Sequence, residues 1–378
     1  MTQAWRGVLV VGGGVAGAAA AIRLRMLGQP VMLWERERLA HHKICGEFLS
    51  AEGVAHLGAL GIDAEALGAV PITATRVVGA QGQVTRRLGF VARSLTRHAL
   101  DAALLARAEA LGAEVRRGVT ARGIDEHGVV LSAHGDVHAP AVLLATGKHN
   151  LRGLPRETAG TIDHLVGFKT YFRLAPAQRA ALAGHSEIIL FRSGYAGLQM
   201  VERDMANLCF LVSPERHAAC GGRFDALLAD LAAEVPHLAR RLDAAVPLLD
   251  RPLAIGGVPY GYLLDPGRDP PFLWRLGDQA AVIPSFTGMG MSLALHGAAL
   301  AVRALMAGEG PISYARTLAR DAQGPLLRAT ALQRLAGEGG RSQARLVGMA
   351  RALPPLVSLA IRATRLSKRA VRRASGTG

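Results

Sequence analysis

The sequence predicts an α/β protein with an α+β insertion: a nucleotide-binding domain, an antiparallel sheet that interrupts it, and a helical C-terminus. Three observations lead to this prediction. A glycine fingerprint follows an apolar strand near the N-terminus, strand-like alternation fills residues 166–212, and helical patterns follow one another from Met289 onwards. With 378 residues, half of them hydrophobic, the chain can bury one large core or two smaller ones.

The glycine fingerprint lies in the stretch Val8–Gly17, which begins with four apolar residues typical of a buried strand. Gly12 permits the tight turn after the strand, and Gly14 lets a pyrophosphate approach the backbone. Gly17 lets the following helix, Ala18–Leu27, pack closely on the strand. The N-terminus of that helix offers unpaired N–H groups and a positive dipole end to phosphates.

A second strand, Pro30–Trp34, ends at Glu35, whose carboxylate suits the hydroxyl groups of a ribose. The complete strand–helix–strand unit with its terminal acid predicts a Rossmann-like dinucleotide site, which a glycine triplet alone would not. We include the neighbouring residues Val15, Ala16 and Arg36 among its predicted contacts.

The three cysteines, Cys45, Cys209 and Cys220, show no spacing suited to zinc or an iron–sulfur cluster. We therefore expect no metal site and a reducing, cytoplasmic environment. The stretch Gln279–Val302 contains no Asp, Glu, Lys or Arg and is long enough for a membrane span. Its proline, serine and glycine residues favour a buried loop and helix instead.

The net charge of +15 is concentrated at the C-terminus, because 341–378 contains nine Lys or Arg and no acidic residue. This is a property of the tail and does not indicate a nucleic-acid-binding surface. The tail also has an apolar side, which Pro354 and Pro355 interrupt. Three interpretations remain open: contact with an anionic membrane, contact with an acidic carrier protein, or a helix packed on the domain.

The pattern along the chain predicts a discontinuous organisation. We assign 1–72, 93–160 and 270–305 to the nucleotide-binding domain. We assign 73–92 and 161–269 to the antiparallel-sheet domain that covers the cofactor and binds the substrate. The helical region with its basic tail takes in 306–378.

Three separated signals give the chain a resemblance to a known family. They are the glycine loop with Glu35, Arg97 at a helix start, and the pair Gly277-Asp278 followed by the turn Thr287–Met291. Together they resemble the FAD-binding oxidoreductases of the p-hydroxybenzoate hydroxylase fold. The loop Cys45–Glu47 is similar to the geranylgeranyl reductase and flavin-dependent halogenase branches.

The resemblance implies roles for particular residues. Asp278 would bind the ribityl chain of FAD, Arg97 would contact the FAD, and the backbone of Val119 would meet the adenine. A capping Asp, a surface Arg and a plain sheet residue are the alternatives. The full set of implied cofactor contacts also includes Cys45, Gly46, Thr146, Gly147, Gly277, Pro284, Thr287, Gly288, Met289, Gly290 and Met291.

The chain also departs from the aromatic hydroxylases of this fold. Thr146, Ala281 and Ser292 stand where those enzymes tend to have Asp, His and Asn. These differences put hydroxylase-type handling of NAD(P)H in doubt. The Trp-x-Trp-x-Ile-Pro signature of tryptophan halogenases is absent as well.

The candidates for chemistry are few, because a flavin would supply the redox step and the protein would supply orientation and protons. Glu47 is a candidate proton donor or a surface or capping residue. Cys45 is a candidate redox group or a packing residue. Tyr260 is a candidate for the pocket wall or the core.

The hypothesis that follows is an FAD-dependent monooxygenase acting on a bulky apolar or carrier-bound metabolite, with NAD(P)H or a separate reductase as electron donor. A reductase that saturates carbon–carbon double bonds is the alternative, and a halogenase is less favoured. The non-enzyme alternative is a flavin electron carrier. We expect a cytoplasmic protein with possible peripheral contact to a membrane through its tail.

Overall fold

The computed structural model describes residues 2–267, 269–337 and 340–375, and all bounds below refer to these. Its first layer is a five-stranded sheet in the order β18-β11-β2-β3-β7, in which every neighbouring pair is parallel. The strands are β2 (Val8–Val11), β3 (Val31–Glu35), β7 (Glu114–Arg117), β11 (Ala141–Leu144) and β18 (Leu273–Arg275). The predicted opening strand–helix–strand unit is therefore present.

The continuous apolar run of β2 follows from burial on both faces of this sheet. Val8 and Val10 point into a core shared with the helices α1 (Val15–Met26), α3 (Arg97–Ala110) and α8 (Gly290–Met306). Leu9 and Val11 point the other way, into a core beneath a small second sheet. That sheet has the order β1-β10-β9-β8, with β1 (Thr2–Ala4), β8 (Ala121–Ile124), β9 (Val129–Ser132) and β10 (Asp136–His138).

The glycine loop between β2 and α1 is shaped by close approaches of the backbone. Gly12 has a φ of 109°, in the region that side chains rarely adopt, and it packs against the carbonyl of Ala145. A Cβ on Gly17 would overlap the Gly12 carbonyl oxygen, so only glycine allows this distance between helix and strand. The tight turn and close packing expected of these two glycines are present.

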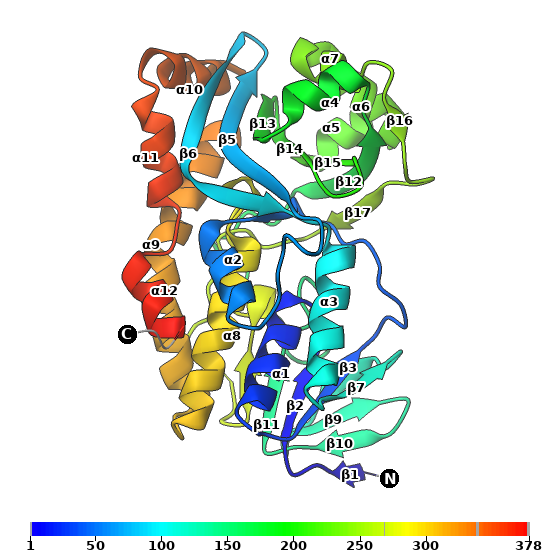
Figure 1. Cartoon of the computed structure of the whole chain (residues 1–378), viewed down its shortest axis with the longest axis vertical. Helices are drawn as coiled ribbons and strands as arrows, with labels where there is room; N and C mark the ends of the chain where they lie inside the picture. The colour runs from blue at the N-terminus through cyan, green and yellow to red at the C-terminus, as the bar shows by residue number, and fades with distance from the viewer. Residues whose placement is uncertain (1, 268, 338–339, 376–378) are drawn as a thin grey trace.

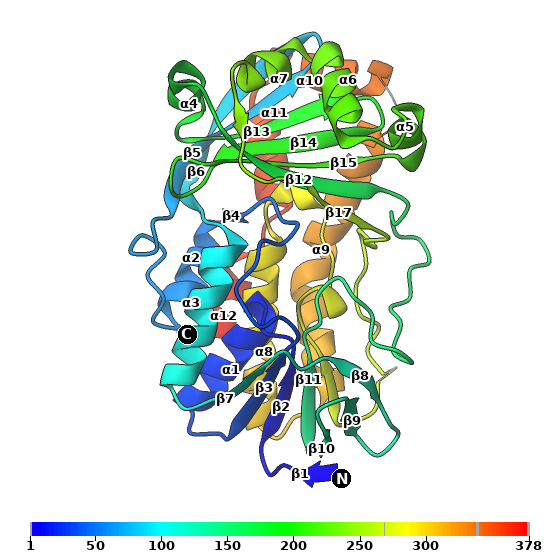
Figure 2. The same ribbon diagram turned by 90° about the vertical axis from the view of Figure 1, so that its right-hand side faces the viewer.

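A nine-stranded sheet lies at the other end of the molecule (Figures 1 and 2). Its main path is β16-β12-β15-β14-β13-β5-β6-β4, and β17 pairs with β12. The strands are β4 (Phe48–Leu49), β5 (Val70–Gly79), β6 (Gly82–Ser94), β12 (Val166–Arg173), β13 (His185–Phe191), β14 (Gly194–Met200), β15 (Ala206–Val212), β16 (Val246–Pro247) and β17 (Leu253–Gly256).

One detail of this sheet differs from the expected antiparallel arrangement. The pair β13–β5 is parallel, so the sheet is mixed, not purely antiparallel, although its other pairs are antiparallel. Strand β17 ends at Gly256, because Gly257 and Gly261 take positive φ values of 70° and 98° and turn the chain.

The two faces of the nine-stranded sheet have different partners. Alternate residues such as Phe168 and Phe210 point outward into an apolar core with the helices on that face. These helices are α4 (Pro176–Leu182), α5 (Pro214–Ala219), α6 (Phe224–Glu234) and α7 (Pro236–Leu242). Their intervening neighbours, such as Lys169 and Cys209, lie on the opposite face, toward the five-stranded sheet.

The helical C-terminal region runs along the length of the molecule and joins its two ends (Figures 1 and 2). Helix α9 (Pro311–Gly337) packs on α8, and α10 (Gly340–Ala352) and α11 (Pro355–Ala363) lie against β6. Helix α12 (Lys368–Ser375) returns to α8. The final residues, 376–378, lie outside the described part of the chain.

Polar contacts fasten these helices to the rest of the chain, among them the following. Arg365, after α11, makes a double hydrogen bond with Glu52 of α2 (Ala51–Gly58), and its guanidinium stacks on the ring of Phe90. Asp321 of α9 pairs with Arg373 of α12 and accepts from His296 of α8. Of the three interpretations of the tail, packing on the domain therefore holds for α12.

The uncharged stretch 279–302 forms a turn and the buried helix α8. Within the described residues, no single helix is long and apolar enough to cross a membrane. One bent pair, Ser342–Ala352 with Pro355–Ala374, passes that test by length and composition only.

Two glycine-to-alanine variants, one a control, test the packing of the glycine loop. Gly17→Ala should lower the free energy of unfolding by about 1–3 kcal/mol, because its methyl group must displace the Gly12 carbonyl. The control Gly58→Ala lies in helix α2 with open space around it and should raise stability by about 0.5–1 kcal/mol. Urea unfolding of both variants measures the effect, and a neutral Gly17→Ala would contradict the packing argument.

Candidate functional site

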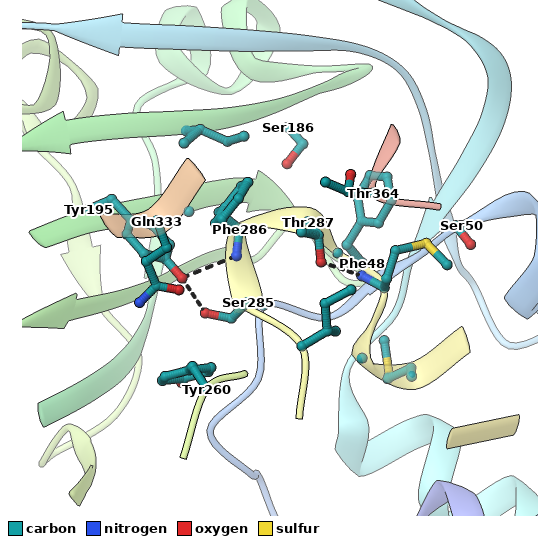
Figure 3. A pocket seen from close by; sticks show the side chains of 18 of the residues that line it. Phe48, Ser50, Ser186, Tyr195, Tyr260, Ser285, Phe286, Thr287, Gln333 and Thr364 are labelled. Atoms are coloured by element: carbon teal, nitrogen blue, oxygen red, sulfur yellow. Dashed lines mark hydrogen bonds between the residues drawn. The ribbon is translucent and has the colours of Figure 1, made fainter. Parts of the chain in front are cut away.

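One long cavity of about 780 Å³ runs between the two sheets. It begins at the glycine loop and passes the loop Cys45–Glu47 and the turn that precedes α8. It ends between the nine-stranded sheet and the helices α9–α11. Figure 3 shows side chains of this cavity, with Tyr195, Tyr260 and Ser285 close to one another and Phe48 beside Thr287. Segments far apart in the sequence thus meet around a single space.

The end of the cavity at the glycine loop combines free backbone N–H groups with a fixed cation. Helix α1 starts after Gly14 with no side-chain cap, so its first N–H groups have no partner within the helix. Arg97 lines the cavity here, and a Cβ on Gly14 would lie 3.3 Å from its Nη2. Asp101 orients Arg97 through two hydrogen bonds of 2.8 Å and also binds Lys43. This arrangement suits an anionic group such as a diphosphate.

The residues predicted for the adenosine end lie together beside this loop but outside the cavity wall. Glu35 accepts a hydrogen bond of 2.8 Å from the Gly13 N–H with one oxygen, and its backbone carbonyl accepts from Val119 N–H at 3.0 Å. Arg36 extends into solvent and pairs with Glu37. The Glu35 carboxylate thus holds the glycine loop.

Asp278 contributes a carboxylate to the middle of the cavity. Asp278 lies in the single turn Gly277–Gln279, lines the cavity and faces Lys148 Nζ at 3.4 Å. Gly147 lines the cavity too, whereas the Thr146 hydroxyl donates to the His149 carbonyl at 2.8 Å. Of the predicted cofactor contacts in this region, Asp278 and Gly147 line the cavity, whereas the Thr146 hydroxyl is bonded within its own loop.

The turn before α8 leads into a second helix start that lines the cavity. Ser285–Thr287 makes a single helical turn, and Gly288 follows with a φ of 66°. A Cβ on Gly288 would overlap the Phe48 ring. Both this overlap and the positive φ therefore require glycine at this position. Helix α8 then starts at Gly290 without a side-chain cap, which leaves the N–H groups of its first turn free.

Most of the predicted residues around this turn line the cavity: Thr287, Gly288, Met289, Gly290 and Met291. Pro284 does not; its carbonyl accepts the Thr287 hydroxyl at 2.8 Å. The N-terminus of α8 gives this wall a positive dipole end.

The loop Cys45–Glu47 lines the same cavity and is held from above by the nine-stranded sheet. Asn207 donates to the Cys45 carbonyl at 3.1 Å, and Gln199 donates to the Gly46 carbonyl at 2.9 Å. The Glu47 carbonyl accepts from the Ser94 hydroxyl and from a second backbone N–H. The backbone of the loop is therefore fixed on three sides.

The Glu47 side chain is buried completely and forms an ion pair with the equally buried Lys169, at 2.5 Å. The same carboxylate oxygen accepts from Tyr171 and from the Arg97 N–H, each at 2.8 Å. Burial raises the pKa of Glu47, although Lys169 and these two hydrogen bonds oppose the shift. The second carboxylate oxygen has no protein partner among the described residues.

Glu47 therefore links two parts of the structure. Its carboxylate contacts Lys169 of the nine-stranded sheet, here called the covering sheet, and the Arg97 N–H at the start of α3. Glu47 has a φ of 60°, which costs a residue with a side chain roughly 1–2 kcal/mol. The surrounding hydrogen bonds hold it there.

The cavity has a polar patch opposite the turn before α8. The Tyr195 hydroxyl lies 2.5 Å from the Ser285 hydroxyl and accepts from the Phe286 N–H at 3.1 Å (Figure 3). Tyr260 lines the cavity beside them and is also packed in the buried core, so both of its predicted interpretations fit the structure. Burial raises the pKa of Tyr195, Tyr260 and Cys209, the last to about 12, so these groups stay protonated at neutral pH.

Sequence reasoning missed several of these residues. The sheet contributes Lys169, Gln199 and Asn207. Gln199 and Asn207 each stand between apolar neighbours, and that contrast was the available signal, since a buried polar residue needs a partner. Lys169 lies in a strand with other polar residues and had no such signal. The apolar cavity lining from α9–α11 had no such signal.

The fold of this chain is similar to the folds of known flavin-dependent enzymes. The brominase Bmp2, a flavin-dependent enzyme, superposes with a TM-score of 0.76 at 18% identity, over 96% of this chain and 93% of Bmp2. The myxobacterial chondrochloren halogenase CndH, an FAD-dependent halogenase, gives 0.73 at 19% identity, over 99% and 96%. The chain has the fold of the FAD-dependent halogenases. The predicted fold resemblance and the α/β architecture with a helical C-terminus are thus confirmed.

Sequence comparison finds similarity over a smaller part of the chain than structural comparison does. No family model matches the chain. AqdB1 of Rhodococcus erythropolis, named as a 2-heptyl-3-hydroxy-4(1H)-quinolone synthase, is 34% identical over 145 residues. The match covers 36% of this chain and 38% of AqdB1, so it spans little more than a third of that relative.

A double-mutant cycle tests the buried pair. Lys169→Met and Glu47→Gln should each lower the free energy of unfolding by about 3–5 kcal/mol, because each leaves a buried group without its partner. The double variant should lose clearly less than the sum. The exposed pair Arg179–Asp204, at 2.8 Å, is the matched control, and Arg179→Met with Asp204→Asn should show coupling below about 1 kcal/mol. Additive losses at Lys169 and Glu47 would contradict the assigned pairing.

Proposed function

We propose that this protein is an FAD-dependent monooxygenase that acts on a bulky, mostly apolar metabolite. The observation that carries the proposal is the continuity of the cavity. One space joins a phosphate-type site at Gly14 and Arg97, a carboxylate at Asp278, the free N–H groups at the start of α8, and an apolar chamber. FAD has its diphosphate, ribityl chain and ring system in that same order.

The described residues fit an FAD. The first turn of α1 and Arg97 would hold the diphosphate, and Asp278 would accept hydrogen bonds from the ribityl hydroxyls. The turn Thr287–Met291 and the N-terminus of α8 would meet the ring, where N–H groups stabilise negative charge. Glu35 would have to exchange its bond to the Gly13 N–H for a ribose hydroxyl, or share its oxygens between them.

Bound FAD would supply the electron transfer and the activation of oxygen. The chain's own residues bind, orient and exclude water. The apolar chamber keeps water from the reacting groups, and the hydroxyls of Tyr195, Ser285 and Tyr260 offer hydrogen bonds to a polar part of the substrate. Electrons would come from NAD(P)H or a reductase, with one oxygen atom passing to the substrate and the other to water.

The substrate class follows from the chamber and from the partial relative. The walls beyond the turn are mostly aliphatic, with residues such as Val77, Ile188, Leu332 and Val357. AqdB1 is named for a hydroxylated quinolone with a heptyl chain. An aromatic ring near the polar patch with an aliphatic chain in the chamber would match both observations.

Halogenation is the second candidate, and the fold comparison favours it, since both Bmp2 and CndH are halogenases that align over almost the whole chain. Saturation of a carbon–carbon double bond is the third candidate, because the Cys45–Glu47 loop is similar to that of the geranylgeranyl reductase branch. A flavin electron carrier is the non-enzyme alternative.

Asp278 provides a test of FAD binding. Asp278→Ala should weaken FAD binding by about tenfold to a hundredfold, because a charged hydrogen-bond acceptor is lost. Titration of the apoprotein with FAD, followed by flavin fluorescence, measures this. Asp243→Ala removes an exposed carboxylate after α7 and should leave FAD binding unchanged. Wild-type protein that binds no FAD would exclude the proposed function altogether.

The reaction type is tested with the reduced holoenzyme and alkylquinolones as the first substrates. Monooxygenation predicts a product that carries one atom from isotopically labelled oxygen and forms without halide. A product that requires bromide or chloride would assign a halogenase, and turnover without oxygen would assign a reductase. Oxidation of the reduced flavin without product from any tested substrate would favour the electron carrier.

A further inference from the structure

The surface formed by the end of α9, by α10 and by α11 carries an unusual concentration of exposed apolar side chains. In the described part of the chain, 14 large hydrophobic residues are exposed, and five of them lie within 335–359. They are Leu335, Met349, Leu353, Leu356 and Leu359, with exposed fractions of 41–61%. Soluble surfaces rarely gather such residues in one place unless something covers them.

Basic side chains surround this patch. Arg345, Arg351 and Arg362 are exposed on the same two helices. Leu356, Leu359 and Arg362 fall at i, i+3 and i+6 of α11, and all three are exposed, so they share one helical face. Both helices lie at the edge of the molecule (Figure 1). No acidic residue occurs anywhere in 341–378. The patch is therefore apolar with a positive surround.

The substrate chamber reaches the surface at this patch. Leu335, Met349, Leu356 and Leu359 are each exposed to solvent and also line the cavity. A cavity whose mouth is lined by leucine and methionine presents apolar surface to water. Covering that mouth with an apolar phase removes the cost of exposure.

We propose that this face of α10 and α11 docks on an anionic lipid surface, and that an apolar substrate enters the chamber directly from the bilayer. Leucines on one side of short helices with arginines around them are the composition of helices that lie in a membrane interface. The arginines match the charge of anionic headgroups.

A protein partner fits these features less well. An acidic carrier protein would pair with the arginines but would leave the leucines at the mouth without apolar cover. A second copy of the chain would bring arginines against arginines, because a symmetric interface places the same patch on both sides. The bilayer satisfies the charges and the apolar residues together.

Vesicle co-sedimentation of the full-length protein tests the proposal without any substrate, so its outcome is independent of the proposed reaction. The protein should bind vesicles of equal parts phosphatidylglycerol and phosphatidylcholine, and should bind pure phosphatidylcholine far more weakly. Binding should fall as salt rises, because exposed charges are screened. No binding to the anionic vesicles would overturn the proposal.

The matched variants separate this face from the net charge. The triple variant Leu353→Ser, Arg345→Gln, Arg362→Gln should bind at least about thirtyfold more weakly, since each arginine near an anionic surface contributes roughly fivefold. None of these three residues lines the cavity. The control Val246→Ser, Arg173→Gln, Arg240→Gln makes the same changes at exposed positions elsewhere and should bind like the wild type. Equal loss in both variants would overturn the docking face.

A second measurement reports insertion. Leu353→Trp in vesicles that contain phosphatidylglycerol with brominated acyl chains should lose tryptophan fluorescence on binding. Leu131→Trp, on the small sheet beneath the first layer, should not. Quenching of neither, or dimer formation that the triple variant abolishes in the absence of vesicles, would assign the face to another partner and refute the proposal.

Discussion

A buried ion pair between Lys169 and Glu47 connects the two halves of this molecule. Lys169 belongs to the covering sheet, and Glu47 belongs to a loop beside the parallel sheet. Two ions removed from water are stable only with close contact and further hydrogen bonds, which Tyr171 and the Arg97 N–H provide here. The pair therefore ties the loop at the cavity wall to the covering sheet and, through the Arg97 N–H, to the start of α3.

The same contact connects fold and chemistry. Glu47 receives the first N–H of α3, so the position of the sheet is transmitted to Arg97 and to the phosphate end of the cavity. Gln199 and Asn207 hold the backbone of the same loop. A site assembled in this way has a rigid wall on the side of the predicted cofactor. Apolar side chains of α10 and α11, such as Met349 and Val357, line the cavity at its far end.

Those helices have a role that differs from that of an ordinary terminal segment. They close the chamber, they carry the exposed leucines at its mouth, and they are tied to the rest of the chain through Arg365 and Glu52. Three arginines of the tail, Arg345, Arg351 and Arg362, are thus located on the helices where the cavity meets the surface. Charge, apolar patch and cavity mouth coincide in space, although composition presented them as separate features.

The sequence by itself determined the parts of this protein that local physics controls. The tight turn at Gly12, the close packing at Gly17 and the glycine turn at Gly288 each require a particular residue at a particular place, so the pattern is readable from the chain. Period-two alternation likewise predicted the strands β12 to β15 within 166–212. The tertiary structure decided which polar residues meet. Lys169 and Glu47 are 122 positions apart, and nothing local distinguishes their pairing from solvation. The cavity walls were also decided there, because aliphatic residues carry no mark of the space they will enclose.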